Sequence, residues 1–166
     1  LDFKRWRRTA DCCSAKGKRH AIAAGGTHSA QAGHEMYRLG GNAIDASVAI
    51  AFVLAVERPY SLGLGGGGFM MVHLPNKKNV FVDFRETAPA KATKNMYLDP
   101  QANVIKGMST DGALAIATPG FVLGLFEIHK KWGKLPWKKV IDPSIRIAEN
   151  GFLVFPVYCL LSSVYL

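Results

Sequence analysis

The sequence predicts an α+β fold in which a β-hairpin is combined with several helices. Three observations carry this prediction: an alanine-rich apolar segment at 42–56, two β-rich runs at 67–74 and 79–84, and a periodic apolar stripe at 121–132. The first and last have the length or spacing of helices, whereas the two runs between them have strand length. The chain has 166 residues, 49% of them hydrophobic and 20% charged, which is enough for one domain with a core and argues against disorder.

The first helix is expected at about 28–39, after a short apolar run at 20–26 that we interpret as a strand leading into a turn. Its apolar face is defined by residues at helical spacing, namely Ala32, Met36 and Leu39. The glycines at 40–41 follow as C-cap residues and end the helix.

The second helix, at about 42–56, is predicted to be the buried centre of the fold. Asn42 is a suitable N-cap, and Asp45 lies in the first turn, where the helix dipole favours a negative charge. From residue 46 to residue 56 every side chain except that of Ser47 is apolar, which is typical of a helix that is buried or crosses a membrane. About 20 apolar residues are needed to cross, so burial is the interpretation.

The hairpin is preceded by a glycine-rich segment at 63–68 and followed by Arg85 and Glu86. No Gly-Lys-Ser/Thr follows the glycines, so they do not form a phosphate-binding loop of the Walker type. An arginine at the end of a strand, beside flexible backbone, can bind a carboxylate through two parallel hydrogen bonds. An ordinary turn and a solvated surface ion pair are the alternatives, so these residues alone make Arg85 a candidate anion-binding residue.

After the hairpin the sequence predicts a surface loop, a short strand and three helices. These elements are expected at about 90–110, at 114–117, at 118–132, from 136, and at 142–150. Thr118 is the expected N-cap of the first of these helices. Pro143 is interpreted as the first residue of the last one, because proline is favoured at a helix start.

The chain contains no pattern typical of a metal site or a disulfide framework. Cys12, Cys13 and Cys159 lack zinc-binding spacing and are odd in number, so free thiols are expected. His28 and His34 are six residues apart, which places them on different faces of their helix. We therefore predict neither a metal nor a cofactor.

The net charge of +9 raises the question of nucleic-acid binding. The basic residues are dispersed along the sequence, with local clusters at 4–8 and 16–19, and no aromatic-interleaved recognition module accompanies them. A basic surface is more often simply solvated, so nucleic acid is not an expected partner.

The two ends differ in character from the rest of the chain. Residues 1–19 are expected to be a basic, poorly ordered leader, which could lie beside an anionic membrane. The first residue is Leu rather than Met, so we expect a fragment or a processed form; no signal peptide is visible, and the missing N-terminus leaves membrane association open. The apolar tail at 153–166 contains Pro156 and is an altered end, a packed tail or an aggregation-prone one; it is too short to predict a transmembrane segment.

Several separated motifs resemble the N-terminal part of the large subunit of γ-glutamyltranspeptidase. They are GGNAIDASVA at 40–49, GLGGGGF at 63–69, DFRETAPAKA at 83–92, STDGALAIATPG at 109–120 and GKLPWKKVIDPSIRIAENGF at 133–152. The similarity assigns 20–152 to one incomplete large-subunit domain and is lost in the tail.

The resemblance implies a partial αββα sandwich of the N-terminal nucleophile hydrolase type, with strands 67–74 and 79–84 in one sheet covered by helices 28–39 and 42–56. It implies an enzyme of glutathione metabolism, a transferase or hydrolase that acts on γ-glutamyl donors such as glutathione. It also implies a precursor that cleaves itself, a small subunit as partner, and an extracytoplasmic location. Matched to the family motif, Arg85 binds the α-carboxylate of the donor, with Glu86 beside it.

The catalytic nucleophile of that family is the threonine at the start of the small subunit, and this chain has no match for it. Its threonines are all internal: Thr9, Thr27, Thr87, Thr93, Thr110 and Thr118. No catalytic residue is therefore assigned, and the chain alone is expected to be inactive. The alternatives are a non-catalytic relative that binds a small amino acid or a partner, and an unrelated basic binding module.

Overall fold

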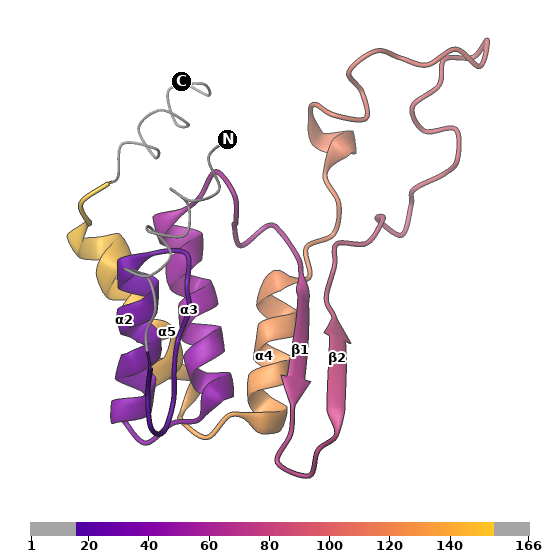
Figure 1. Cartoon of the computed structure of the whole chain (residues 1–166). Coiled ribbons are helices and arrows are strands. Elements are labelled where there is room, and N and C mark those ends of the chain that lie inside the picture. Colours follow the sequence, from indigo (N-terminus) through magenta and orange to yellow (C-terminus); the bar gives the residue numbers. More distant parts are fainter. Residues whose placement is uncertain (1–15, 155–166) are drawn as a thin grey trace, which may run out of the picture.

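The computed structural model describes residues 16–154, which form a mixed fold of helices and one β-hairpin. The elements are α2 (Thr27–Arg38), α3 (Ala43–Glu57), β1 (Phe69–His73), β2 (Asn79–Asp83), the 3-10 turn η2 (Ala113–Ala115), α4 (Phe121–Trp132) and α5 (Trp137–Asn150). Helices α2 and α5 pack against α3, and α4 lies between α3 and the hairpin (Figure 1). The predicted mixture of helix and strand is confirmed. The predictions for the three cysteines, and most of those for the leader and the tail, fall outside the described residues.

The prediction of a central buried helix is confirmed by α3. Its first turn is capped by Asn42, whose side chain accepts hydrogen bonds from the backbone N–H groups of Ile44 and Asp45 at 2.9 and 3.1 Å. Val48, Ala49 and Val53 are fully buried. Because neighbours pack around most of this helix, nearly every side chain in it must be apolar.

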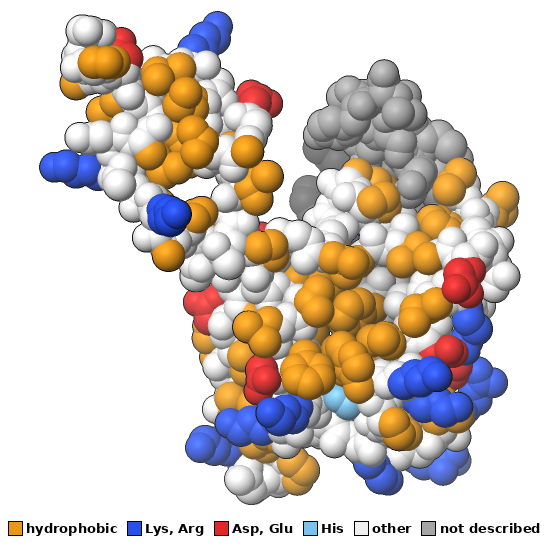
Figure 2. All heavy atoms as spheres, turned by 180° about the vertical axis from the view of Figure 1, so that it is seen from behind, with side chains coloured by type: hydrophobic (Ala, Val, Ile, Leu, Met, Phe, Trp, Pro, Cys, Tyr) orange, Lys and Arg blue, Asp and Glu red, His pale blue; other side chains and the backbone are white. Residues whose placement is uncertain are grey.

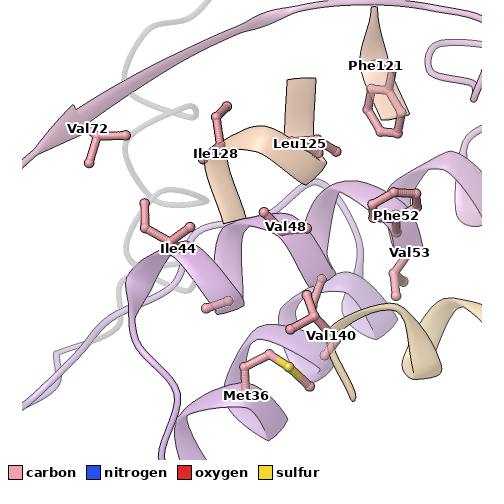
Figure 3. Close-up of a cluster of buried hydrophobic side chains, with 13 residues drawn as sticks. Met36, Ile44, Val48, Phe52, Val53, Val72, Phe121, Leu125, Ile128 and Val140 are labelled. Carbon is pink, nitrogen blue, oxygen red and sulfur yellow. The ribbon is translucent and has the colours of Figure 1, made fainter. Parts of the chain in front are cut away.

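The hydrophobic core lies where α3 meets the other helices and the hairpin. Figure 3 shows side chains from five elements converging there: Met36, Ile44, Val48, Phe52, Val53, Val72, Phe121, Leu125, Ile128 and Val140. The ring of Phe52 lies edge-on to those of Phe121 and Trp137, at 5.6 Å from each. This one cluster joins α3 to both α4 and α5, so the helices and the hairpin form a single packed unit.

The sequence predicted only that Asp45 complements the dipole of α3. In the structure Asp45 also links α3 to another part of the fold. Its side chain is completely buried, and its Oδ1 lies 3.0 Å from Nε2 of His129 near the end of α4. The same carboxylate accepts hydrogen bonds from the backbone N–H groups of Lys134 and Leu135 in the α4–α5 turn, at 3.0 and 3.1 Å. A buried carboxylate requires such partners, and here they tie the start of α3 to the α4–α5 turn.

Glu57 has the corresponding role at the other end of α3. Its carboxylate oxygens accept hydrogen bonds from the backbone N–H groups of His28 and Ser29, each at 3.1 Å. These groups belong to the first turn of α2, where N–H groups have no partner within the helix. A Cβ on Gly26 would lie 2.3 Å from this carboxylate, so the contact depends on glycine.

The hairpin prediction is also confirmed. Strands β1 and β2 are antiparallel, and the register pairs Phe69 with Asp83 and His73 with Asn79. One face of the hairpin points inward, with Val72 in the core, whereas the other exposes aromatic and apolar side chains: Phe69 is 56%, Met71 68% and Phe81 58% exposed.

Helices 28–39 and 42–56 were expected to cover the hairpin, but a different helix covers it in the structure. Helix α4 contacts β2 directly, whereas α2 packs against α3 on the side away from the hairpin (Figure 1). The reason is the width of α4's apolar stripe. Leu125 and Ile128 face the core beside the buried side of β1. A helix that packs both on α3 and on the hairpin leaves no place there for α2.

Two predicted strands are wrong. Residues 20–26 form no strand; Ile22 instead packs over Gly33 of α2. Residues 114–117 lie partly in η2, with Leu114 52% and Ile116 65% exposed. A β-strand requires a neighbouring strand for its backbone hydrogen bonds, and neither segment has one among the described residues.

The start of α4 and the course of α5 also differ from the predictions. Thr118 does not cap α4, because α4 begins after Gly120. The backbone of Thr118 instead pairs with that of Thr87. Helix α5 runs without a break through Pro143, where two helices were expected. A proline inside a helix removes one hydrogen bond, but Pro143 lies buried with Val140 on the side that packs against α3, and this burial offsets the loss.

Between β2 and α4 the chain forms a long excursion, residues 88–117, which we call the arm (Figure 1). Its base is closed by two backbone hydrogen bonds between Thr87 and Thr118, at 3.2 and 2.9 Å. None of the helices in the described part of the chain has the length and hydropathy needed to cross a bilayer.

Candidate substrate-binding site

Arg85 lies two residues beyond the end of β2, and its backbone is held there by a hydrogen bond from its N–H to Oδ1 of Asp83, at 2.9 Å. Its side chain is 60% exposed, and its Nε lies 3.2 Å from Oε2 of Glu86. The guanidinium carbon is 5.9 Å from the centre of the Phe69 ring. Within the described residues its two terminal amino groups make no hydrogen bond, so they can donate to a carboxylate.

Glu86 is less exposed than Arg85, at 25%, and its carboxylate lies against the glycine-rich segment. Its Oε2 is buried and forms no hydrogen bond with the described residues, so the contact with Arg85 is an ion pair only. A buried carboxylate oxygen without a hydrogen bond is costly, which favours keeping the cation close. The pair is therefore more enclosed than a fully solvated surface pair, although Arg85 itself remains accessible.

The glycine-rich segment joins the Arg85 region to the start of α4. The carbonyl oxygen of Gly66 accepts hydrogen bonds from the backbone N–H groups of Gly120 and Phe121, at 3.1 and 2.9 Å. A Cβ on Gly67 would lie 2.6 Å from the carbonyl oxygen of Phe84, and one on Gly120 only 2.1 Å from the same atom. Glycine is required at these two positions because backbone approaches backbone there.

Beside Arg85 an open groove of about 900 Å³ runs between β2 and α4. Its walls are mainly apolar, with Val82, Phe84 and Leu123 among them, and Arg85 provides a positive charge. A mainly apolar groove with a few fixed polar groups is the usual form of a small-molecule site.

A family model described as gamma-glutamyltranspeptidase matches residues 29–163, which is most of the chain. The chain belongs to the γ-glutamyltranspeptidase family. The matched range extends beyond residue 152, where the motif comparison placed the end of the similarity.

Individual members of the γ-glutamyltranspeptidase family are similar to this chain in sequence and in structure. The glutathione hydrolase proenzyme of Pseudomonas aeruginosa is 46% identical over 134 residues, which are 81% of this chain and 24% of that protein. The structure of γ-glutamyltranspeptidase from Helicobacter pylori has a TM-score of 0.79 at 46% identity, covering 84% of this chain and 40% of that one. The enzyme from Pseudomonas nitroreducens complexed with L-DON has a TM-score of 0.84 at 41% identity, covering 90% and 44%. The chain thus spans about a quarter of the length of the curated relative.

The structure brings together the Arg85, Glu86 and glycine-rich motifs that the family resemblance singled out. Sequence reasoning did not find the contacts of α4 with this region, because Thr118 was assigned to a helix cap and Gly120 and Gly124 were not singled out. One feature of the sequence could have indicated the close approach of Gly120 to Phe84. Glycines occur at 120 and 124, four residues apart, on a helix face that is otherwise bulky.

Other polar clusters lie away from Arg85. Hydrogen bonds from Asn103 lower the pKa of Asp99 in the arm. Arg146 of α5 bonds Glu35 of α2, and this contact raises the pKa of the arginine. His34 lies near His20, with Nε2 of His20 3.3 Å from its Nδ1, rather than near His28. The described residues hold no group of three or more side chains placed to bind a metal.

Proposed function

We propose that this chain is part of a γ-glutamyltransferase that also hydrolyses glutathione, transferring the γ-glutamyl group to water or to an amino acid. The proposal is supported by the family membership and by relatives named glutathione hydrolase. The observation that carries it is the position of Arg85, fixed by its backbone at the end of β2 with its terminal amino groups directed to no described partner, beside a mainly apolar groove. Such a guanidinium suits the α-carboxylate of a γ-glutamyl donor.

The reaction would be an acyl transfer. A threonine hydroxyl attacks the γ-carbonyl carbon, and its own α-amine takes the proton. The amine passes this proton to the leaving nitrogen as the amide C–N bond breaks, which gives an acyl-enzyme that water or an amino acid then resolves. No threonine within residues 1–166 matches the family nucleophile, so we place the nucleophile on the small subunit. In this scheme Arg85 binds the α-carboxylate of the donor. Glu86 forms an ion pair with Nε of Arg85 and so orients the two terminal amino groups toward the donor.

We also propose that the hairpin belongs to one sheet of an αββα sandwich. The outward face of the hairpin exposes Phe69, Met71 and Phe81, and a second sheet contributed by the rest of the precursor would cover them. The domain division at residues 19 and 152 and the extracytoplasmic location remain parts of this proposal.

The first test compares two forms of the protein. A precursor that carries these residues together with its small subunit is expected to split into two subunits and to release the amine from a γ-glutamyl anilide. Residues 1–166 purified alone are expected to give no turnover above the buffer blank. Turnover by the 166-residue chain that survives repurification would contradict the placement of the nucleophile, and an intact, inactive precursor would favour a non-catalytic binding protein.

A second prediction concerns the glycine-rich segment. In the precursor, Gly67→Ala is expected to raise the KM for the donor roughly 10- to 100-fold, because its Cβ would force residues 84–86 and hence Arg85 to move. Gly65→Ala is the matched control, since a Cβ there meets nothing within 4 Å. Equal KM values for the two variants would show that the placement of Arg85 does not depend on this contact.

A further inference from the structure

Three turns of the fold meet at one end of the molecule: the α2–α3 turn, the β1–β2 turn and the α4–α5 turn (Figure 1). One hydrogen bond and one shared groove support this arrangement. The side-chain amide of Asn42 donates a hydrogen bond to the carbonyl oxygen of Trp132 at 2.7 Å, and Val80 lines the same groove as Trp132. The side chains on and beside these turns therefore form one continuous surface.

This surface is strongly cationic. Eight exposed basic side chains, which we call the basic end, belong to it: Arg38, Lys77, Lys78, Lys130, Lys131, Lys134, Lys138 and Lys139. Figure 2 shows Lys and Arg side chains gathered at the corresponding lower end of the molecule. The eight positive charges of the basic end are nearly equal to the net charge of the whole chain, which is +9.

Acidic side chains lie at the edge of the basic end: Glu127 lines the same groove as Lys130 and Lys131, and Glu35 and Asp142 bond Arg146. The sequence ranges 38–44, 73–80 and 128–141 contain neither Asp nor Glu. The carboxylate of Asp45 lies close by, but it is buried and already binds His129 and the backbone of the α4–α5 turn. The basic end is thus a concentrated positive field, which attracts anionic surfaces.

The composition of the basic end favours an extended anionic surface over a single small anion. Seven of the eight cations are lysines, which act as point charges and lack the fork that arginine uses to recognise one phosphate group. They project from three separate turns. Such an array suits many weak contacts spread over a plane.

Apolar groups among these charges favour a lipid surface over nucleic acid. Leu39 is 48% exposed at the α2–α3 turn, and Trp132 is partly exposed, with Nζ of Lys131 4.7 Å from the centre of one of its rings. Tryptophan and lysine together are typical of the membrane interface. The hairpin is a two-stranded ribbon of the kind that can enter a DNA groove, but it contributes only its turn, with Lys77 and Lys78, to the basic end.

We propose that the basic end docks this protein on the surface of a bilayer that contains anionic phospholipid. The proposal does not depend on the γ-glutamyl chemistry. The β1–β2 turn and Arg85 lie at opposite ends of β2, so the docked orientation keeps Arg85 away from the lipid and open to solution. The far end of the groove beside Arg85 is lined by Lys130, Lys131 and Trp132, so the basic end adjoins the candidate donor site on that side.

The experiment is co-sedimentation of the 166-residue chain with phosphatidylcholine vesicles, with and without phosphatidylglycerol. The chain is expected to bind only the anionic vesicles and to be released by salt. The triple variant Lys130→Gln/Lys134→Gln/Lys138→Gln is expected to lose about fivefold in affinity per lysine, or on the order of 100-fold in total.

The matched control is Lys91→Gln/Lys94→Gln/Lys106→Gln, which removes the same charge from exposed lysines of the arm. It is expected to stay within about twofold of the unchanged chain, because these residues lie away from the basic end. Replacing Lys130, Lys134 and Lys138 by Arg retains the charge and is expected to retain binding, which separates docking from misfolding.

Three results would overturn the proposal. The first is an absence of binding to anionic vesicles. The second is an equal loss of affinity in the two triple Gln variants, which would show a dependence on net charge alone. The third is binding to a short DNA duplex at the same salt that is as tight as binding to vesicles, which would point to nucleic acid as the partner.

Discussion

Replacing Arg85 with Lys, in a precursor that contains these residues and its small subunit, is expected to raise the KM for a γ-glutamyl donor about 10- to 150-fold. Lysine keeps the positive charge but cannot form two parallel hydrogen bonds with a carboxylate. A hydrogen bond to a charged group contributes about 1.5–3 kcal/mol, which corresponds to this range. The effect should fall mainly on KM rather than kcat, because the α-carboxylate keeps its charge throughout acyl transfer.

Arg85→Ala should weaken donor binding at least as much, while the thermal midpoint changes little because the side chain is 60% exposed. Arg38→Ala provides a control, since Arg38 is an exposed arginine at the opposite end of the molecule. A normal donor KM in Arg85→Ala would show that Arg85 belongs to a surface ion pair and does not hold the substrate.

Val48→Asp is expected to destabilise the folded chain by about 3–5 kcal/mol, because it places an uncompensated charge in the core. Val48 is fully buried on α3, and the core around it joins α3 to α2, α4, α5 and β1. Small domains have a free energy of unfolding of only about 5–15 kcal/mol, so this variant should lose a large part of it. Urea unfolding followed by far-ultraviolet circular dichroism measures the change.

Ala43→Asp is the matched control for Val48→Asp. It adds the same charge to the same helix, but at the exposed first residue of α3, where the helix dipole favours an acidic side chain. We expect its urea midpoint to equal or exceed that of the unchanged chain. Similar midpoints for the two variants would mean that α3 is not the buried centre of the fold.

Helices and strands that are determined by their own residues and by those directly beside them were predictable from the sequence. Asn42 followed by a long apolar run defines the start and the burial of α3, and two β-rich runs around a polar turn define the hairpin. The motif around Arg85 placed that residue at the end of a strand beside a glycine-rich segment, as the structure shows. In each case the residues that determine the structure are close together in sequence.

Elements that depend on distant neighbours were not predictable in the same way. The run at 114–117 has strand composition but no strand to pair with among the described residues, and Pro143 remains inside α5 because that side of the helix is buried against α3. The partners that tie Asp45 to His129 and to the α4–α5 turn are 84 to 90 residues away along the chain. No local pattern reveals such contacts, because they form only when separate helices pack.

The charge distribution shows the same division. The sequence by itself determined the number and type of the basic residues, and along the chain they are dispersed. Only the tertiary structure decided that the α2–α3, β1–β2 and α4–α5 turns meet at one end, which gathers eight cations into the basic end. The physical reason is that packing on a common core fixes where each turn lies, whereas the charge of a turn is set by residues that the core does not contact.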